Sequence, residues 1–476
     1  MLDMRRIYQG VAVPQMMYAC SAWSNAKSTE AAYTTQTLQT LRSLQARAAR
    51  AIGGAFKATS TVALDVETHL LPVQRQIEKH NAEALCRMLV SKSGRKLVVA
   101  EQSPAQRKRP KRYLSPLQNI SRWAQEHGGA ELNTYEQIPA FVVPPWWQGV
   151  QTHIDIAEAA CRRNEEMTIT DTVSIYTDGS KRAGVVGAAA VAPRLQQTRR
   201  MCLGSEAAVT EYAAELQGIS LGLSIAQTVT NHSPAQQQIA IWTDSKAAIR
   251  ALNRPEGKSG AHILAQIVAQ VEALRSRGHS LTVRWVPAHQ GIEGNELADR
   301  AAKEATGWRD DGSVGSRADP PATRHSHQYA TKSWHRKQSE QRWLSAWQAE
   351  SKGRVSFRYT PVPSRVVLRL HKGLSKRESS ILVQLRTEKI GLKDFLFWRN
   401  VPGIRDPMCP CREGRQTVRH VLLVCRKLHD LRQEIFGQDD ERTDLRDILT
   451  KRKLANKAIQ LIEQAGILGQ HRIAEE

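Results

Sequence analysis

Four carboxylates between residues 173 and 305 constrain this chain of 476 residues more than any other feature: Asp178, Glu215, Asp244 and Asp299. Like charges that lie close together repel one another unless a cation stands between them, and hard divalent ions such as Mg²⁺ or Mn²⁺ prefer oxygen ligands. Two such ions ~3.5–4 Å apart can activate a water molecule and stabilise the leaving oxygen of a phosphodiester. The alternative is four separate, solvated surface carboxylates.

The local patterns argue for a shared site. Residues 173–177 alternate as a strand does, and Asp178-Gly179 is expected to end that strand. A second, buried strand over 239–243 is followed by Asp244 and then by a helix. Glu215 borders an apolar stripe with helical spacing, and Asp299 lies in the first turns of a helix that we expect to be capped near Asn295. Open α/β sheets bind ligands beyond the carboxyl ends of their strands, so we expect the carboxylates to line one crevice.

This block, 171–306, resembles a type 1 ribonuclease H domain in the segments YTDGS, AEL, WTDS and HQGIEGNELAD. The resemblance implies a ribonuclease H-like α/β fold with a mixed sheet and hydrolysis of the RNA strand of an RNA–DNA hybrid. It also implies that Asp178, Glu215, Asp244 and Asp299 hold two Mg²⁺ or Mn²⁺ ions, and that His289 moves protons during product release. An integrase or transposase of this fold would end on a glutamate. The interval from Asp244 to Thr282 lacks the basic, Trp-rich handle of some members, which leaves hybrid affinity to the flanking regions.

The charge distribution supports a nucleic-acid partner, because the formal net charge of +22 lies mostly outside the block. Residues 171–306 hold 14 Lys and Arg against 12 Asp and Glu, a net of +2. Residues 1–170 hold 21 against 14, a net of +7, and residues 307–476 hold 33 against 20, a net of +13. A generic solubilising surface is the alternative interpretation of this excess.

Seven cysteines, three of them between 409 and 425, favour a reducing compartment with a local metal site over a disulfide framework. We therefore expect an intracellular protein, nuclear or cytoplasmic. Arg5-Arg6 precedes an apolar stretch that Gln9 and Pro14 interrupt, which argues against a signal peptide. No run approaches the ~18 apolar residues of a membrane span, so no membrane partner is expected.

Residues 1–90 predict a small helical bundle, with helices over 34–52, 60–69 and 72–90. Their segments YACSAW, LQARAARAIGGAFKATST and LLPVQRQIEK resemble the thumb, and the region just after the thumb, in the reverse transcriptases of non-LTR retrotransposons. A polymerase palm would supply two adjacent aspartates in a hairpin, whereas the Asp-Asp pairs here, Asp310-Asp311 and Asp439-Asp440, stand in polar, turn-rich contexts. We expect the chain to begin downstream of a polymerase site, with an upstream reverse transcriptase segment as a possible partner.

The remaining segments are two linkers and a tail. Residues 91–170 are expected to form a basic linker, with QRKRPKR and a short helix over 117–127, and then a docking segment, FVVPPWW. Residues 307–327 form a second linker. Residues 328–476 form a basic helical tail, in which 378–400 is apolar at helical spacing, the tryptophans near 343 belong to the core, and final helices span about 426–436 and 444–467.

The tail carries a Cys/His knuckle at Cys409, Cys411, His420 and Cys425, a set that predicts a zinc site. It resembles the knuckle at the end of non-LTR polyproteins but departs from the retroviral spacing. In an unbroken α-helix, His420 and Cys425 would point about 140° apart at ~100° per residue, so the helix must begin near His420 or hold the ion from its frayed end. His429 is a substitute ligand, and four ordinary residues with no ion is the alternative.

The order of these segments resembles the carboxyl-terminal part of a non-LTR retrotransposon polyprotein. The resemblance implies removal of the RNA template from the hybrid made by reverse transcription. Two further interpretations stay open: a catalytically silent fragment that binds nucleic acid, and a host protein that has adopted the domain.

Overall fold

The structure is a computed structural model that describes residues 1–24, 32–101, 117–118, 134–231, 235–309, 311, 313, 315–437 and 444–469. Contacts divide the chain into two compact units. One is Asn81–Lys337, which contains the sheet, and the other combines Met1–His80 with Gln338–Glu476. The QRKRPKR cluster, most of the helix expected over 117–127, and Asp310, Asp439 and Asp440 lie outside the described residues.

The sheet unit is built on six strands in the order β1-β6-β5-β2-β3-β4. The strands are β1 (Gln151–His153), β2 (Val173–Arg182), β3 (Val185–Ala192), β4 (Gln197–Ser205), β5 (Gln238–Thr243) and β6 (Ser280–Trp285). The helices are α7 (Lys92–Glu101), α10 (Ala157–Ile169), α11 (Glu211–Asn231), α12 (Lys246–Asn253), α13 (Ala261–Arg275) and α14 (Glu293–Ala305). Strands β1, β6, β5 and β2 run parallel, while β3 is antiparallel to both β2 and β4, so the sheet is mixed. The fold class expected from the sequence is confirmed.

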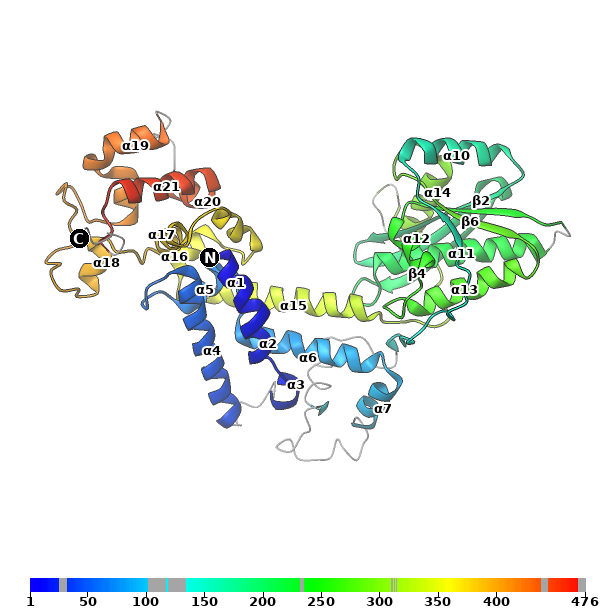
Figure 1. Ribbon diagram of the computed structural model, residues 1–476, viewed down its shortest axis with the longest axis horizontal. Coiled ribbons are helices and arrows are strands. Elements are labelled where there is room, and N and C mark those ends of the chain that lie inside the picture. Colours follow the sequence, from blue (N-terminus) through cyan, green and yellow to red (C-terminus); the bar gives the residue numbers. More distant parts are fainter. Residues whose placement is uncertain are drawn as a thin grey trace. The chain divides into compact units, whose positions relative to one another are not determined.

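Helices cover both faces of this sheet, as Figure 1 shows. Ile175 and Ile241 point into a core shared with α11, α12 and α13. Their neighbours Tyr176 and Trp242 point to the opposite face, where they pack with α14. This alternation is the period of a strand buried on both faces, and it fixes which carboxylates can meet at the end of the sheet.

Two local expectations about this unit were wrong. Asp178-Gly179 does not end its strand, because β2 continues to Arg182 in antiparallel pairing with β3. Asn295 does not cap α14, which begins at Glu293 after Ile292 and has no side-chain cap, so Asn295 lies inside the first turn. In both cases the boundary of the strand or helix was inferred from a local turn or cap residue. Strand pairing and helix packing set the actual boundaries at other residues.

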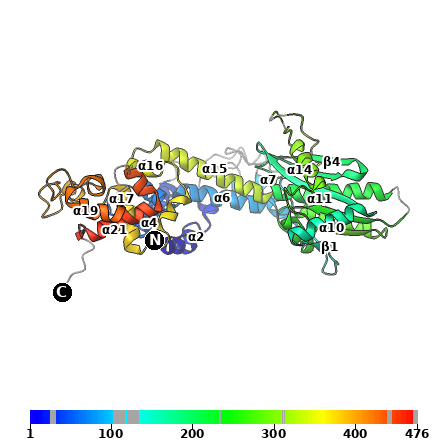
Figure 2. The ribbon, with the colours of Figure 1, turned by 90° about the horizontal axis from the view of Figure 1, so that it is seen from above.

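The second unit is helical (Figure 2). Its N-terminal helices are α1 (Leu2–Ile7), α2 (Val13–Met16), α3 (Cys20–Trp23), α4 (Ala32–Gly53) and α5 (Thr61–Glu67), with a π-helical segment at Tyr8–Ala12. Its later helices are α16 (Arg354–Tyr359), α17 (Lys376–Thr387), α18 (Lys393–Trp398), α19 (His429–Phe436), α20 (Leu445–Thr450) and α21 (Arg452–Gln464). Helices α6 (Val73–Leu89) and α15 (Gln328–Ala349) each contain a unit boundary. The three helices expected in residues 1–90 agree with α4, α5 and α6.

The N-terminal helices and the tail share one core in this unit. Arg386 on α17 donates from Nε to Glu67 of α5 at 2.7 Å, and both side chains are fully buried. Arg386 also donates to Thr360 Oγ1 and to the backbone oxygen of Leu449. A buried pair of this kind is satisfied only when all of its partners are in place, so the two sequence segments depend on one another.

The helix suggested by residues 378–400 is interrupted. α17 ends at Thr387, Glu388 takes a left-handed conformation with a φ of 51°, and α18 begins at Lys393. Of the three tryptophans expected in the core, Trp343 and Trp347 are buried, while Trp334 is half-buried. Among the described residues, no helix has both the length and the apolar character to cross a membrane.

Candidate active site and the Cys/His cluster

Asp178 and Asp244 are brought together by the register of two parallel strands. The pairing of β2 with β5 ends at Thr177 opposite Thr243, so each aspartate is the next residue after the last parallel pair. β5 stops there, whereas β2 continues against β3 alone. The two carboxylates therefore stand side by side where the parallel part of the sheet ends, which is the expected place for a ligand in an open α/β sheet.

Glu215 reaches the same place from α11, which crosses β2 and β3 at close range. Oxygen atoms of Asp178, Glu215 and Asp244 lie within 4.8 Å of one another. Asp178 is 6% exposed, and Oε2 of Glu215 is buried with no hydrogen-bond partner. A buried carboxylate oxygen without a partner is costly, so this atom calls for a cation.

The electrostatics of the three carboxylates agree with that geometry. Burial, followed by the charges of Asp244 and Asp299, raises the pKa of Asp178 above its ordinary range. Burial, followed by the charges of Asp178 and Asp244, raises the pKa of Glu215. The pKa of Asp244 is raised by burial and by Asp299. Mutual repulsion in a poorly solvated place favours the protonated forms, and a divalent ion would reverse this preference.

Asp299 is close to this cluster but is not one of its three converging members. It lies on α14, where Lys303 binds its Oδ2 at 2.5 Å, one helical turn further on. Its charge nevertheless raises the pKa of both Asp178 and Asp244. Of the four carboxylates singled out in the sequence, the structure thus brings three together and holds the fourth at the border with a lysine partner.

His289 lies in the loop before α14, is exposed, and has a left-handed φ of 54°. Its charge lowers the pKa of Asp244, which places the imidazole beside that carboxylate. Asp244 is further held by a hydrogen bond from the side chain of Asn295, and its backbone oxygen accepts from Nε1 of Trp285 at 3.0 Å.

Three residues that help to build the site were missed as contributors in the sequence. Lys303 could have been found, because it follows Asp299 at the i,i+4 spacing that pairs opposite charges on a helix. Trp285 carries no such signal, since its bond to Asp244 depends on the pairing of β5 with β6. Gly179 was taken as a turn residue, whereas its role is to let α11 approach the sheet.

The donor set of the acidic cluster fits hard divalent cations. Its ligand atoms are carboxylate oxygens, which Mg²⁺ and Mn²⁺ prefer, and one of them has no protein partner. Asp178, Glu215 and Asp244 would hold such ions, with Asp299 at the border.

The helical unit contains a second cluster, in which Cys409, Cys411, His420 and Cys425 place their ligand atoms within 4.8 Å of one another. The Sγ atoms of Cys409 and Cys425 are 3.6 Å apart, and Sγ of Cys411 is 3.2 Å from Nε2 of His420. Ligands ~2.1–2.3 Å from a tetrahedral zinc ion are roughly 3.5–3.8 Å apart. The donor set and the 3.6 Å between the two sulfur atoms therefore fit zinc, whereas the 3.2 Å from Cys411 to His420 is shorter than this range.

A π-helical turn resolves how His420 and Cys425 can face one ion. Residues His420–Val424 form this turn, and the backbone nitrogen of Cys425 donates to the oxygen of His420 at 2.7 Å. The bond spans five residues, so the two side chains fall on the same face instead of about 140° apart as in an α-helix. The expectation that a helix begins near His420 is confirmed, since the turn starts at His420 and Cys425 follows its last residue; the sequence did not indicate that the turn is π-helical. His429, the substitute ligand, is exposed and does not belong to the cluster.

The other two ligands come from a tight turn. The backbone nitrogen of Cys409 donates to the oxygen of Gly414, and that of Arg412 donates to the oxygen of Cys409. A Cβ on Gly414 would stand 3.4 Å from Nδ1 of His420, so the turn lies directly against the imidazole. The pKa of Cys411 is lowered, chiefly by a hydrogen bond from the backbone of Glu413, which favours the thiolate that binds metal.

Comparison with known proteins places the acidic cluster in a family. Residues 170–307 match the RNase H family. A ribonuclease H from Chromohalobacter salexigens is 30% identical over 150 residues, which cover 28% of this chain and 84% of that protein. The Pol polyprotein of equine infectious anemia virus (strain Wyoming) is 31% identical over 134 residues, which cover 28% of this chain and 10% of the polyprotein.

The chain thus spans about one tenth of the length of the Pol polyproteins that it matches. Among solved structures, an N-terminal RNase H domain from Mycobacterium tuberculosis, fused to maltose-binding protein, is 24% identical. The match covers 28% of this chain and 99% of that one, with a TM-score of 0.21. By its likeness to the bacterial ribonuclease H, and through residues 170–307, this chain belongs to the RNase H family.

Proposed function

We propose that this protein is an endoribonuclease that hydrolyses the RNA strand of RNA–DNA hybrids with two Mg²⁺ or Mn²⁺ ions. One observation carries the proposal: three carboxylates of an RNase H family domain converge within 4.8 Å, and one of their buried oxygens has no partner. When bound, the ions would activate the attacking water and stabilise the leaving oxygen.

The protein's own residues would have separate roles in this reaction. Asp178, Glu215 and Asp244 would bind the ions and orient them at the end of the parallel strands. Lys303 would keep the carboxylate of Asp299 in an ion pair beside the acidic cluster. A metal ion bound at the cluster would then compete with Lys303 for this carboxylate. The exposed imidazole of His289, beside Asp244, would take up and release protons as the product leaves.

A basic groove in the sheet unit would hold the hybrid. This groove, of about 1100 Å³, is lined by five cationic residues, Arg87, Arg250, Arg254, Lys258 and Lys332, together with Tyr212 and Tyr329. Glu256 also lines it and forms ion pairs with Arg254 and Lys258, so the groove keeps an excess of positive charge. Tyr212 precedes Glu215 by three residues on α11, so the groove begins one helical turn from the acidic cluster. Cationic side chains along a phosphate backbone supply most of the affinity for nucleic acid.

Two of these cations come from outside the family domain: Arg87 from α6 and Lys332 from α15. They would compensate for the basic handle that is missing between Asp244 and Thr282. The other three, Arg250, Arg254 and Lys258, belong to the nuclease block, so the groove combines cations of the block with cations of its flanks.

The tail cluster would bind one structural zinc ion. Three thiols and one imidazole form a closed four-ligand set, and a structural zinc site contributes directly to folding. The ion would fix the turn at Cys409–Gly414 to the π-helical turn at His420–Val424.

We further propose that the chain derives from a retroelement polyprotein and acts together with an upstream reverse transcriptase segment. The support is the resemblance of residues 1–90 to a reverse transcriptase thumb and the likeness of the family domain to viral Pol polyproteins. The nuclease would then remove the RNA template after DNA synthesis.

A substrate panel tests the activity. The full chain with Mg²⁺ or Mn²⁺ is incubated with four labelled substrates of one sequence: hybrid, double-stranded RNA, double-stranded DNA and single-stranded RNA. Cleavage confined to the RNA strand of the hybrid supports the proposal. Tight binding of the hybrid without cleavage would instead favour the catalytically silent binding protein.

A further inference from the structure

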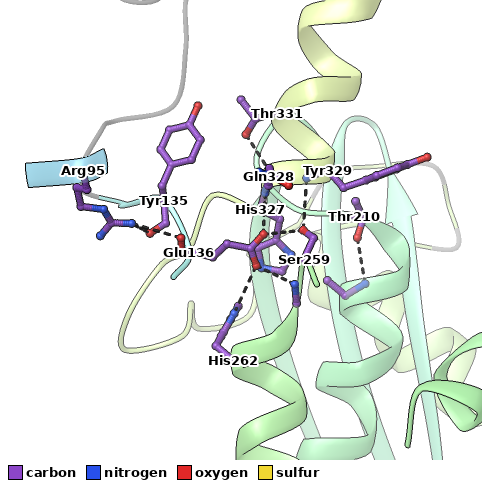
Figure 3. Close-up of polar contacts among 12 residues, drawn as sticks. Arg95, Tyr135, Glu136, Thr210, Ser259, His262, His327, Gln328, Tyr329 and Thr331 are labelled. Carbon is purple, nitrogen blue, oxygen red and sulfur yellow. Dashed lines mark hydrogen bonds and ion pairs between the residues drawn. The ribbon is translucent and has the colours of Figure 1, made fainter. Parts of the chain in front are cut away.

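A third cluster of metal-binding side chains lies in the sheet unit, outside the acidic site. Glu136, His262 and His327 each place a ligand atom within 4.8 Å of the others. They come from three segments: an extended stretch before β1, the first turn of α13, and the start of α15 (Figure 3). The sequence gives no reason to connect them, because more than 60 residues separate each from the next.

The backbone assembles the cluster before any ion is considered. Tyr135 forms a parallel bridge with Ser326, and the backbone nitrogen of Glu136 donates to the oxygen of Ser326 at 3.1 Å. The backbone nitrogen of His327 donates to Ala208 at 2.6 Å, just before α11. Glu136 and His327 are therefore held at fixed positions beside the first turn of α13.

Glu136 is a fully buried carboxylate with an oriented set of donors. Its Oε1 accepts from Ser259 Oγ at 2.6 Å and from the backbone nitrogen of Gln328 at 2.8 Å. Its Oε2 accepts from the backbone nitrogen of Gly260 at 2.7 Å, and Nδ1 of His262 lies 3.7 Å from it. Carboxylates that bind metals are typically fixed by such hydrogen bonds, and Oε2 keeps a lone pair for an ion.

The distance from His262 to Glu136 is too long for a direct hydrogen bond. It is close to the spacing of two ligands on one ion, since atoms ~2.0–2.2 Å from a tetrahedral metal are roughly 3.3–3.6 Å apart. Nδ1 of His262 has no hydrogen-bond partner, and neither does Nδ1 of His327, a side chain that is 3% exposed. Unpartnered buried imidazole nitrogens beside a fixed carboxylate are the atoms that an ion would satisfy.

The imidazole of His327 is also in the form that binds metal. Burial is the main cause that lowers the pKa of His327 to about 4, so the ring is neutral at neutral pH. His325, whose ring centre is 4.3 Å from that of His262, has its pKa lowered by burial as well. All three histidines line one cavity of about 360 Å³, which leaves room for a water molecule on the ion.

We propose that Glu136, His262 and His327 bind one divalent transition-metal ion, with Zn²⁺ as the reference ion, independently of the nuclease reaction. Two imidazoles and a carboxylate suit zinc with one further ligand, whereas Mg²⁺ and Ca²⁺ prefer oxygen ligands alone. The ion joins the stretch before β1 and the start of α15 to the first turn of α13. The ion thereby fixes the segments that flank the nuclease block to the block itself.

The test uses the full chain in a Cys411→Ser background, so that the tail cluster does not contribute tightly bound zinc. The protein is stripped with chelator, loaded with zinc, dialysed against buffer containing Mg²⁺ to displace zinc from the acidic cluster, and analysed for metal. We expect about one zinc per chain, and loss of it in the further variants His262→Gln and His327→Gln. A matched variant, His153→Gln in β1, should keep the ion.

Co²⁺ provides a second measurement that does not depend on the two histidine variants. Bound to the Cys411→Ser chain, it should give weak visible bands of nitrogen and oxygen ligation without the intense thiolate-to-metal absorption of a cysteine site. Zinc should also raise the Tm of the Cys411→Ser chain, and this gain should vanish in His262→Gln, whose side chain is 28% exposed. A Cys411→Ser chain that retains no zinc, or that retains it in both histidine variants, contradicts the proposal whatever its nuclease activity.

Discussion

A Cβ atom on Gly179 would stand 2.4 Å from the backbone nitrogen of Glu215. The glycine therefore permits α11 to lie directly on β2, and this contact brings Glu215 to Asp178. The backbone N–H of Gly179 also lowers the pKa of both carboxylates, against the larger effect of burial. The Asp-Gly pair thus serves the site through close packing within a continuous strand.

Gly179→Ala should disable the site while the fold survives. The added methyl group meets backbone atoms of α11, which cannot move aside as a flexible side chain would. We expect destabilisation of about 1–3 kcal/mol, as for other overpacked positions, and a loss of roughly 100-fold or more in kcat from the displaced carboxylate. Gly10→Ala is the matched control, because a Cβ there meets nothing within 4 Å. Equal activity of the two variants would contradict this role.

The sequence predicted much of the sheet unit because its signals are local. The strands leading to Asp178 and Asp244 show their period directly, and the order of the four carboxylates carries the family resemblance. The extent of β2 beyond Gly179 could not be predicted, because it depends on pairing with β3, whose run VVGAAAVA has no polar alternation. The π-helical turn at His420 and the meeting of Glu136 with His262 depend on packing between distant segments, which periodicity does not encode.

Asp178→Asn should make the metal-free protein more stable. Burial and repulsion raise the pKa of Asp178 in the folded state, so the folded protein binds more protons there than the unfolded chain does. Stability from this group is greatest at low pH and falls as the pH rises from the unfolded pKa, about 4, through the folded pKa. The amide in Asp178→Asn does not ionise, so the variant does not lose this stability as the pH rises. At pH 8 without divalent ions, we expect a gain on the order of 1–2 kcal/mol, since one pKa unit corresponds to about 1.4 kcal/mol.

Chemical denaturation of both proteins at pH 5 and pH 8 checks this sign. The advantage of Asp178→Asn should be larger at pH 8, and Mg²⁺ should stabilise only the protein with the aspartate. A variant that is less stable than the parent at pH 8 in chelator would show that the carboxylates are not held together under strain.

Replacement of Arg87 and Lys332 by glutamine should weaken hybrid binding at low salt. If each contacts one phosphate, the slope of log K against log salt should become shallower by about 1.4–1.8, at roughly 0.7–0.9 per phosphate. Exposed Lys352 and Lys453, which do not line the groove, remove the same charge when they are changed to glutamine together. Equal changes in slope for the two pairs would mean that general charge, and not the groove, holds the hybrid.

Cys411→Ser should release zinc from the tail and loosen the helical unit. A structural ion stabilises the folded state by RT ln(1 + [L]/Kd), which is about 2.7 kcal/mol at 100 times Kd. In the presence of zinc, the variant should therefore have a lower Tm than the parent. His429→Ala should have the same Tm as the parent, because His429 is exposed and outside the cluster. If the parent and Cys411→Ser had identical zinc content and identical Tm, the proposed zinc site in the tail would be contradicted.

The most direct measurement is the rate of hybrid cleavage by the full chain and by Asp244→Asn, each with Mg²⁺, with Mn²⁺ and with chelator. The amide is nearly isosteric but contributes no negative charge for the ions, so the fold should persist and cleavage should disappear. His289→Ala should slow turnover less than Asp244→Asn, because the imidazole moves protons without holding the ions. The account predicts metal-dependent cleavage of the RNA strand by the parent and none by a folded Asp244→Asn protein. A folded parent that never cuts the hybrid with either ion, or an Asp244→Asn variant that cuts as fast as the parent, would contradict it.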